Sequence, residues 1–192
     1  MRVEKMKGKM NHNKGSGTAL LIVDVQNAAL EKAFRREKIV ENLNVVQAKA
    51  RAMNVPIIFI QHADEELVEG SEGWKFVKEL DVKNGDRIIS KSYNSAFEET
   101  CLETVLQELR ISKIVLGGAA TNWCIRATAY GALDRGFDVT LISDGHTTES
   151  IELGNGKEIL AADIIMEFNI AMSWLKYPGI SNKALLAKEI EF

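Results

Sequence analysis

An almost unbroken apolar run at residues 18–25 constrains the fold of this chain more than any other feature. The run lacks the alternation of a half-exposed strand, so it predicts a strand that is buried on both faces of a sheet. Short apolar runs and amphipathic helical stretches alternate along the rest of the chain. Because parallel strands need helical crossovers, this alternation predicts a parallel sheet covered by helices on both faces.

The spacing of apolar residues predicts the individual elements. Further strands are expected at residues 57–60, 87–90, 113–116 and 137–143. Helices are expected at residues 39–53, 97–109, 125–133, 157–170 and 182–190. Cys101 falls on the apolar face of the second of these helices, which predicts a place in the core.

The composition is that of a globular chain. Of its 192 residues 46% are hydrophobic, and the formal net charge of −3 gives no broad attraction for nucleic acid or an anionic membrane. Two cysteines are too few for a disulfide framework and no apolar run could span a bilayer, so we expect a cytoplasmic protein. The basic segment 1–16 predicts a flexible N-terminal arm, and residues 17–192 predict a single domain.

Three expected strand ends carry reactive side chains. Asp24 ends the first strand, Lys91 follows the third, and Cys124 comes after the turn beyond the fourth. Each has a purely structural reading, since Asp24 could cap a turn, Lys91 could be solvated and Cys124 could be a small buried hydrophobe. Ligands of open parallel sheets bind beyond the carboxyl ends of the strands, so the joint placement favours a catalytic role.

The turn before Cys124 strengthens this interpretation. Gly117 and Gly118 allow a tight turn, and a helix is expected to begin at or just before Cys124. The positive end of the helix dipole, together with Lys91, would then lower the pKa of the thiol. Asp24 could accept the thiol proton and return it to a leaving amine, while backbone N–H groups receive an oxyanion. These groups together predict acyl transfer.

Four segments match those of a known family: LLIVDVQN, IFIQH followed by EGSEGW, RIISKSYNSAF, and VLGGAATNWCIRATAYGALDRGFDVTLISDG. On these segments the chain resembles the isochorismatase-like cysteine hydrolases, which include nicotinamidases and N-carbamoylsarcosine amidohydrolases. The resemblance spans residues 18–170. It implies a Rossmann-like α/β fold, a three-layer sandwich whose mainly parallel sheet has five or six strands.

The same resemblance implies the parts of the site. Its catalytic triad would be Asp24, Lys91 and Cys124. A cis peptide between Ala119 and Ala120 would turn the backbone N–H groups of Ala120 and Cys124 into an oxyanion hole. The resemblance also implies a homo-oligomer, either a dimer or a tetramer, in which neighbouring subunits help to close the pocket. No organic cofactor is expected.

The metal-binding pattern of the nicotinamidases in this family is incomplete here. Those enzymes use an Asp-x-His motif and a further histidine. His62 takes the first histidine position, but Ile60 stands in place of the aspartate, and neither His12 nor His146 falls in the intervening loop. Isoleucine offers no ligand atom, so we expect no catalytic metal.

Six residues near the strand ends are candidates for the substrate pocket. His62 could bond a substrate or satisfy a backbone group at the strand end, and Trp74 and Trp123 could be rim aromatics or anchors of a subunit interface. His146 is expected to be a turn residue. The six candidates are Gln26, His62, Trp74, Tyr93, Asn122 and Trp123.

These observations predict a metal-independent cysteine hydrolase that cleaves a C–N bond of a small amide or ureido compound through a thioester. The cysteine disfavours the vinyl-ether cleavage of isochorismatases proper. Two alternatives stay open: a protein of this fold with a binding or assembly role and no activity, and a nicotinamidase-like hydrolase despite the missing ligands. A nucleotide-binding protein is disfavoured because the chain lacks both GxGxxG and a P-loop.

Overall fold

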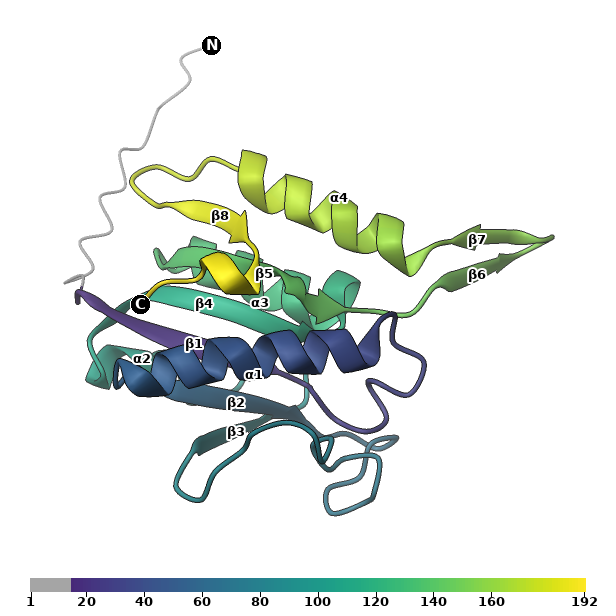
Figure 1. Cartoon of the computed structure of the whole chain (residues 1–192), viewed down its shortest axis with the longest axis horizontal. Coiled ribbons are helices and arrows are strands. Elements are labelled where there is room, and N and C mark those ends of the chain that lie inside the picture. Colours follow the sequence, from purple (N-terminus) through teal and green to yellow (C-terminus); the bar gives the residue numbers. More distant parts are fainter. Residues whose placement is uncertain (1–14) are drawn as a thin grey trace, which may run out of the picture.

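The structure, a computed structural model that describes residues 15–192, is built on one parallel sheet (Figure 1). Residues 1–14 of the expected arm lie outside the described residues. The strands of the sheet are β1 (Gly17–Val23), β2 (Ile57–His62), β3 (Arg87–Lys91), β4 (Ile111–Ala119), β5 (Asp138–Thr147) and β8 (Asn182–Leu185). They lie in the order β3-β2-β1-β4-β5-β8, and every neighbouring pair is parallel. The α/β fold expected from the alternation is confirmed.

The first strand lies inside the sheet, between β2 and β4. Leu20 pairs with Ile57 on one side and with Val115 on the other. The side chains of residues 19–23 are fully buried. Successive side chains of β1 point to opposite faces of the sheet, and helices cover both faces, so all of these side chains are shielded from water. This double burial explains why the apolar run of β1 shows no alternation.

Helices cover both faces of the sheet. One face is covered by α1 (Arg36–Ala52), with a 3-10 turn at Ala187–Glu189 beside it. The other face is covered by α2 (Leu102–Glu108), α3 (Arg126–Asp134) and α4 (Ala161–Trp174). Each face therefore has its own apolar core. No helix among the described residues combines the length and apolar character needed to cross a membrane.

The second helix starts later than expected. The expectation of a helix from residue 97 is wrong for its first turn, because the hydroxyl of Thr100 accepts a hydrogen bond from the Leu102 N–H at 3.2 Å and α2 begins there. Cys101 precedes the first turn and is exposed, so its expected place in the core is also wrong.

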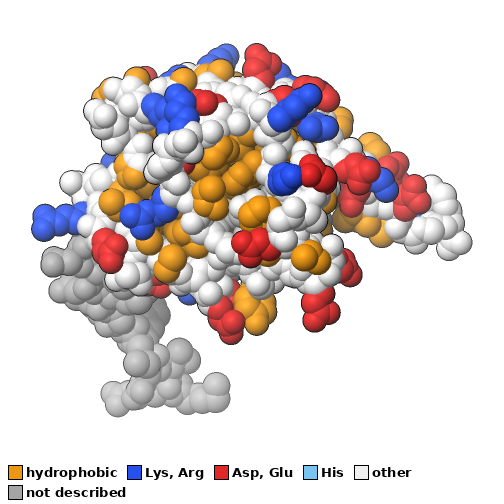
Figure 2. All heavy atoms as spheres, turned by 90° about the horizontal axis from the view of Figure 1, so that it is seen from below, with side chains coloured by type: hydrophobic (Ala, Val, Ile, Leu, Met, Phe, Trp, Pro, Cys, Tyr) orange, Lys and Arg blue, Asp and Glu red, His pale blue; other side chains and the backbone are white. Residues whose placement is uncertain are grey.

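The end of the chain contains strands where helices were expected. Residues 157–159 belong to a hairpin of β6 (Ile151–Gly154) and β7 (Lys157–Ile159). Asn155 and Gly156 at its turn have φ of 54° and 71°, as a type I′ turn requires. Residues 182–185 form β8 rather than a helix, because pairing with β5 satisfies backbone groups that a free edge would leave unpaired. The hairpin projects from the body in two views at right angles (Figures 1 and 2).

The strand order changes direction at β1. The chain proceeds from β1 through β2 to β3 on one side, and from β4 through β5 to β8 on the other. The carboxyl ends of β1 and β4 therefore border a crevice, which is the usual ligand site of open α/β sheets. The residues that follow β1, β2, β3 and β4 meet at this end of the sheet.

Candidate active site

Asp24 directly follows β1 and is held there by the neighbouring strand. Its N–H donates to the carbonyl of Ile60 on β2 at 2.9 Å, which extends the sheet by one residue. Its φ is 50°, a left-handed conformation that costs a non-glycine residue about 1–3 kcal/mol and is found at functional sites. The residue is 3% exposed, so the carboxylate needs a charged partner.

Lys91, the last residue of β3, supplies that partner. Its fully buried Nζ lies 2.7 Å from Oδ2 of Asp24. The same nitrogen lies 3.0 Å from Nδ1 of His62, 3.1 Å from the carbonyl of Tyr93 and 3.2 Å from Sγ of Cys124. An ammonium group has three N–H donors, and four acceptors surround this one. One acceptor is therefore without a proton from Lys91 at any moment.

Cys124 lies in a sharp turn beyond β4. A Cβ on Gly118, whose φ is 126°, would lie 2.0 Å from the carbonyl oxygen of Val23, so only glycine fits at this point of β4. The peptide between Ala119 and Ala120 is cis. A π-helical turn at Thr121–Ile125 follows, with the Ile125 N–H bonded to the Ala120 carbonyl at 3.2 Å, before α3 begins. The half-buried Cys124 belongs to this turn.

The electrostatic environment of the thiol differs from the sequence expectation. Burial and the negative charge of Asp24 raise the pKa of Cys124 to about 12, although the Lys91 ammonium acts in the opposite direction. Burial also raises the pKa of Asp24, against the effect of Lys91. Lys91 lowers the thiol pKa as expected, but burial and Asp24 outweigh it, so the expected net lowering is wrong. The resting cysteine is a neutral thiol beside a carboxylate that can take its proton.

His62 connects Lys91 to a second carboxylate. Its Nδ1 faces the Lys91 ammonium at 3.0 Å, so Nδ1 accepts and the proton of a neutral ring sits on Nε2. Nε2 lies 2.8 Å from Oδ2 of Asp64, whose other oxygen accepts the N–H of Leu67 at 2.7 Å. The His62 N–H donates to Oε1 of Gln26 at 2.9 Å. The ring thus helps to orient the Lys91 ammonium, which also contacts Cys124.

The site offers three metal-ligating groups, but an ammonium lies among them. Asp24, His62 and Cys124 present ligand atoms within 4.8 Å of one another. Lys91 Nζ lies within 3.2 Å of all three side chains. A metal ion would have to displace a positive charge that already bonds to each of them. These residues therefore do not fit a metal.

A cavity of about 550 Å³ opens over the cysteine. It is lined by Asp24 and Cys124 at its base, by Ala120, and by the pocket candidates Gln26, His62 and Trp123. Trp123 is 57% exposed and lies at the rim. The structure thus brings together residues from the ends of β1, β2 and β4 around one space, which is the geometry that a small substrate requires.

The other three pocket candidates do not line this cavity. Trp74 contributes its carbonyl, which accepts the side-chain N–H groups of Gln26 at 2.8 Å and Gln61 at 2.9 Å. Tyr93 offers its carbonyl to Lys91, and its side chain is exposed. Asn122 accepts the hydroxyl of Thr148 at 2.6 Å. These contacts hold the walls of the site.

Sequence reasoning missed several residues of the cavity. Asn94 lies 3.8 Å from the cysteine sulfur through its Oδ1, and Asp64 and Glu149 line the wall. Asn94 stands in the matching segment RIISKSYNSAF, and this position was its only signal. Asp64 and Glu149 belong to loops with no pattern that distinguishes them from surface residues.

A buried histidine supports the cysteine turn from behind. His146 is fully buried on β5; its Nδ1 lies 2.8 Å from the hydroxyl of Thr121 and its Nε2 lies 3.0 Å from Oδ1 of Asn169 on α4. Burial lowers the pKa of His146 to about 4, so the ring is neutral at pH 7. His146 is therefore more than the turn residue expected: it ties the π-helical turn to the sheet.

The sequence also matches a known protein family over most of its length. The isochorismatase domain matches residues 18–155. The chain belongs to the isochorismatase family. It is therefore a member of a hydrolase family, and its six-stranded α/β fold is the fold of that family.

Several members of the isochorismatase family are similar to this chain along most of its length. The isochorismatase family protein YaaI of Bacillus subtilis is 31% identical, over 79% of this chain and 95% of its own. A streptothricin hydrolase of Streptomyces noursei is 27% identical, over 72% of this chain and 57% of its own. Nicotinamidase 3 of Arabidopsis thaliana is 26% identical, over 70% and 75%.

Solved structures share the fold. One isochorismatase family protein superimposes with a TM-score of 0.76 at 28% identity, over 88% of this chain and 97% of that protein. A cysteine hydrolase from Pseudomonas syringae has a TM-score of 0.79 at 20% identity, over 90% and 89%. At that identity the second match concerns the fold alone.

Proposed function

We propose that this isochorismatase-family protein is a cysteine hydrolase that cleaves a C–N bond of a small amide or ureido compound, without a metal and through a thioester. One observation carries the proposal: the buried Lys91 ammonium contacts both Asp24 and Cys124 at the base of a cavity. Relatives named as a streptothricin hydrolase and a nicotinamidase support hydrolysis of small molecules.

Attack on the carbonyl begins with proton transfer from Cys124 to Asp24. The raised pKa values of both groups favour a neutral thiol at rest and a carboxyl able to hold the proton once it has moved. The Lys91 ammonium, whose Nζ already donates to Sγ of Cys124 at 3.2 Å, then stabilises the thiolate. The sulfur attacks the carbonyl carbon, and the oxygen takes the negative charge.

The oxyanion is received by backbone N–H groups, for which we propose Ala120 and Cys124, both of which line the cavity. In well-studied enzymes one such donor lowers the activation barrier by about 3–4 kcal/mol. The C–N bond then breaks, and the leaving nitrogen takes the proton held by Asp24. A thioester on Cys124 and a free amine or ammonia result.

Hydrolysis of the thioester repeats these roles with water. Asp24 accepts a proton from the water, whose oxygen attacks the acyl carbon. The C–S bond breaks, and the sulfur recovers the proton through Asp24. The sum is one amide and one water converted to one acid and one amine, and every group returns to its starting state.

The test is release of ammonia or amine from a panel of small amides and ureides in the presence of chelator. We expect release by the wild type and by Cys101→Ala, which removes the other cysteine, and none by Cys124→Ala. Rapid quenching and intact-mass spectrometry should detect the acyl group on the wild type. Activity that disappears in chelator, or persists in Cys124→Ala, would contradict the proposal.

A panel in which every compound is inert would favour the binding role instead. The decisive measurement is then alkylation of Cys124 by a small electrophile. A Cys124 that stays unreactive in Asp24→Asn as well as in the wild type, while exposed Cys101 is modified in both, would show that the triad is not functional.

A further inference from the structure

The helix α4 contacts the π-helical turn beyond β4 at both of its ends. Glu167 forms an ion pair with Arg126, the first residue after the turn. The guanidinium of Arg126 also lies over the ring of Phe168, 4.8 Å from the ring centre. Asn169 reaches the other end of the turn through the side chain of His146. Three consecutive residues of one helix thus hold both ends of this five-residue turn.

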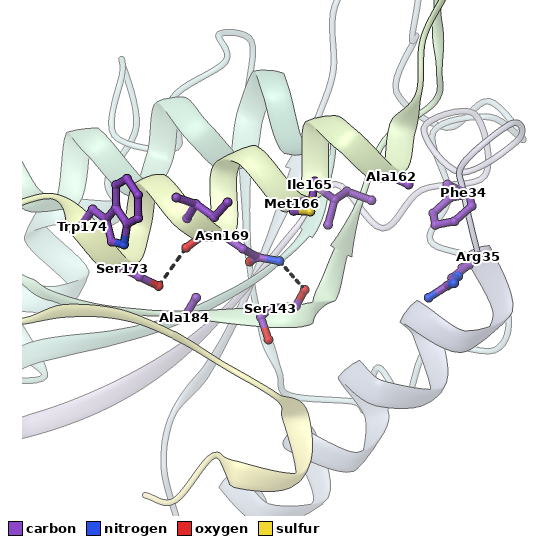
Figure 3. A pocket seen from close by; sticks show the side chains of 11 residues that line it. Phe34, Arg35, Ser143, Ala162, Ile165, Met166, Asn169, Ser173, Trp174 and Ala184 are labelled. Atoms are coloured by element: carbon purple, nitrogen blue, oxygen red, sulfur yellow. Dashed lines mark hydrogen bonds between the residues drawn. The ribbon is translucent and has the colours of Figure 1, made fainter.

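The amide group of Asn169 has only one suitable orientation. Its Nδ2 donates to the carbonyl of Ser143 on β5 at 3.0 Å, and Figure 3 shows this bond reaching from α4 to the sheet. A carbonyl oxygen only accepts hydrogen bonds, so Nδ2 faces Ser143 and Oδ1 faces away from it. Oδ1 lies 3.0 Å from Nε2 of His146. Asn169 is therefore an acceptor toward the histidine ring.

This acceptor fixes the tautomer of His146. Burial lowers the pKa of the ring to about 4, so at pH 7 the ring has a single N–H proton. That proton lies on Nε2, because Oδ1 of Asn169 has no proton to give. Nδ1 is then an acceptor, and the hydroxyl of Thr121, 2.8 Å away, donates to it. Thr121 and His146 are both fully buried, so water does not compete with this order of donors.

Phe168 keeps the histidine ring in this position. The two rings meet edge to face, with their centres 6.0 Å apart and their planes at 88°. A ring that is bonded at both nitrogens and packed against a buried phenyl group cannot rotate without losing one of these contacts. The direction of the Thr121 hydroxyl is therefore set from α4.

We infer that Asn169 is a positioning residue for the hydrolysis proposed above. Through the tautomer of His146 it fixes Thr121, the first residue of the turn that presents Cys124. Thr121 directly follows Ala120, whose N–H is a proposed oxyanion donor, so a displaced Thr121 disturbs both this donor and the sulfur. The role in catalysis rests on the proposed function, whereas the order of donors is a property of the folded protein.

Two substitutions of similar size separate the acceptor from packing. Asn169→Leu removes both hydrogen bonds of the amide, so Nε2 of His146 is left without its partner in either tautomer. Asn169→Asp keeps an oxygen that accepts the Nε2 proton. Asn182→Ala is the matched control, because it removes two asparagine hydrogen bonds at the carboxyl end of α4, to the carbonyls of Met172 and Leu175.

Two measurements need no substrate. Long-range proton–nitrogen correlation spectra should place the proton of the His146 ring on Nε2 in the wild type and in Asn169→Asp. Backbone hydrogen exchange of residues 121–126 should be about fivefold faster in Asn169→Leu, the effect of one lost buried hydrogen bond on local opening. It should be unchanged in Asn182→Ala. A wild-type ring protonated on Nδ1, or a turn that exchanges equally in Asn169→Leu and the wild type, would overturn the inference.

The best substrate of the amide panel then tests the role in catalysis. We expect kcat to fall about 10- to 100-fold in Asn169→Leu, because a small displacement of the reacting groups is costly, while KM stays within about twofold. Asn169→Asp should recover most of this loss, and Asn182→Ala should keep the wild-type kcat per folded molecule. Equal losses of kcat in Asn169→Leu and Asn169→Asp would contradict positioning through the acceptor.

Two further results keep the test decisive. If circular dichroism shows that Asn169→Leu does not fold, Thr121→Val removes the donor at the other end of the same hydrogen-bond chain and keeps the shape of the side chain. It should give the same faster exchange and the same loss of kcat, and wild-type values for both would overturn the inference. A wild type inactive toward the whole panel would contradict the proposed function alone, since the spectra and the exchange rates still decide the order of donors.

Discussion

At the residue scale, the candidate site depends on the buried ammonium of Lys91, which is surrounded by four acceptors but has only three N–H donors. Lys91 neutralises Asp24, reaches Cys124 and is steadied by His62. Because burial and Asp24 both raise the pKa of the thiol, reactivity of Cys124 depends on proton transfer rather than on a standing thiolate. Nucleophile activation and general-base function can therefore be separated experimentally.

Asp24→Asn should separate them. It removes the negative charge that raises the pKa of Cys124 but keeps the Lys91 ammonium, so the thiol pKa should fall. We expect faster alkylation of Cys124 by iodoacetamide at pH 8, together with amide hydrolysis reduced by a factor of about 10²–10⁴. Cys101→Ala in both proteins confines the alkylation to one thiol. Slower alkylation in the variant would contradict this account of the site.

His146 should give a pH-dependent contribution to stability. Its folded pKa of about 4 lies below the ordinary value of 6.5, so between these pH values the unfolded chain binds a proton at His146 that the native state does not. Stability is therefore lost as the pH falls from 6.5 toward 4, by up to about 3 kcal/mol. Below the folded pKa the loss stops growing.

A matched pair of urea titrations measures this contribution. His146→Gln keeps groups that can bond Thr121 and Asn169 but does not titrate. As the pH falls from 6.5 toward 4, the free energy of unfolding should decrease more in the wild type than in the variant. A constant difference would show that His146 titrates normally.

At the scale of elements, the end of β4 decides where the cysteine lies. Gly118 lets β4 approach Val23 of β1 closely, just before the chain turns into the π-helical segment. Gly118→Ala should destabilise the protein by more than about 3 kcal/mol, because the new Cβ meets Val23 and the φ of 126° is unfavourable.

The hairpin glycine provides the control for that variant. Gly154 also has a positive φ, 77°, but a Cβ there would meet no atom within 4 Å. Gly154→Ala should therefore cost only about 1 kcal/mol, from the conformation alone. Thermal unfolding measures the stability that each variant loses. Equal losses in Gly118→Ala and Gly154→Ala would mean that the close approach of β4 to β1 adds nothing to the cost of the substitution.

At the scale of the whole molecule, carboxylates dominate the field over the cavity. Glu31, Asp64, Glu66 and Glu149 line it, and Lys32 is the one Lys or Arg side chain among the described lining residues. A positively charged amide should therefore have a higher kcat/KM than its negatively charged isostere, by about tenfold at low salt. The ratio should shrink as salt screens these charges, and a ratio independent of ionic strength would contradict this electrostatic origin.

The sequence by itself determined the layers of the fold and the strand ends that carry Asp24, Lys91 and Cys124. Burial on both faces removes alternation, and parallel strands place their carboxyl ends on one edge, so both results follow from local pattern. Asn155 and Gly156 suit a turn with two positive φ values, but the hairpin around them was not predicted, and a helix was expected from residue 157. The segment match RIISKSYNSAF likewise contained Asn94, although nothing local marked it.

Only the tertiary structure decided the charges and the partners. The pKa of Cys124 depends on burial and on Asp24, which is distant in sequence, so the local helix end predicted the wrong direction. The strand β8 forms because β5 offers an unpaired edge, a fact that no local spacing contains. His146 acquires its role from Thr121 and Asn169, on two other segments. Burial and long-range pairing act across the chain, and periodicity reports only on neighbours.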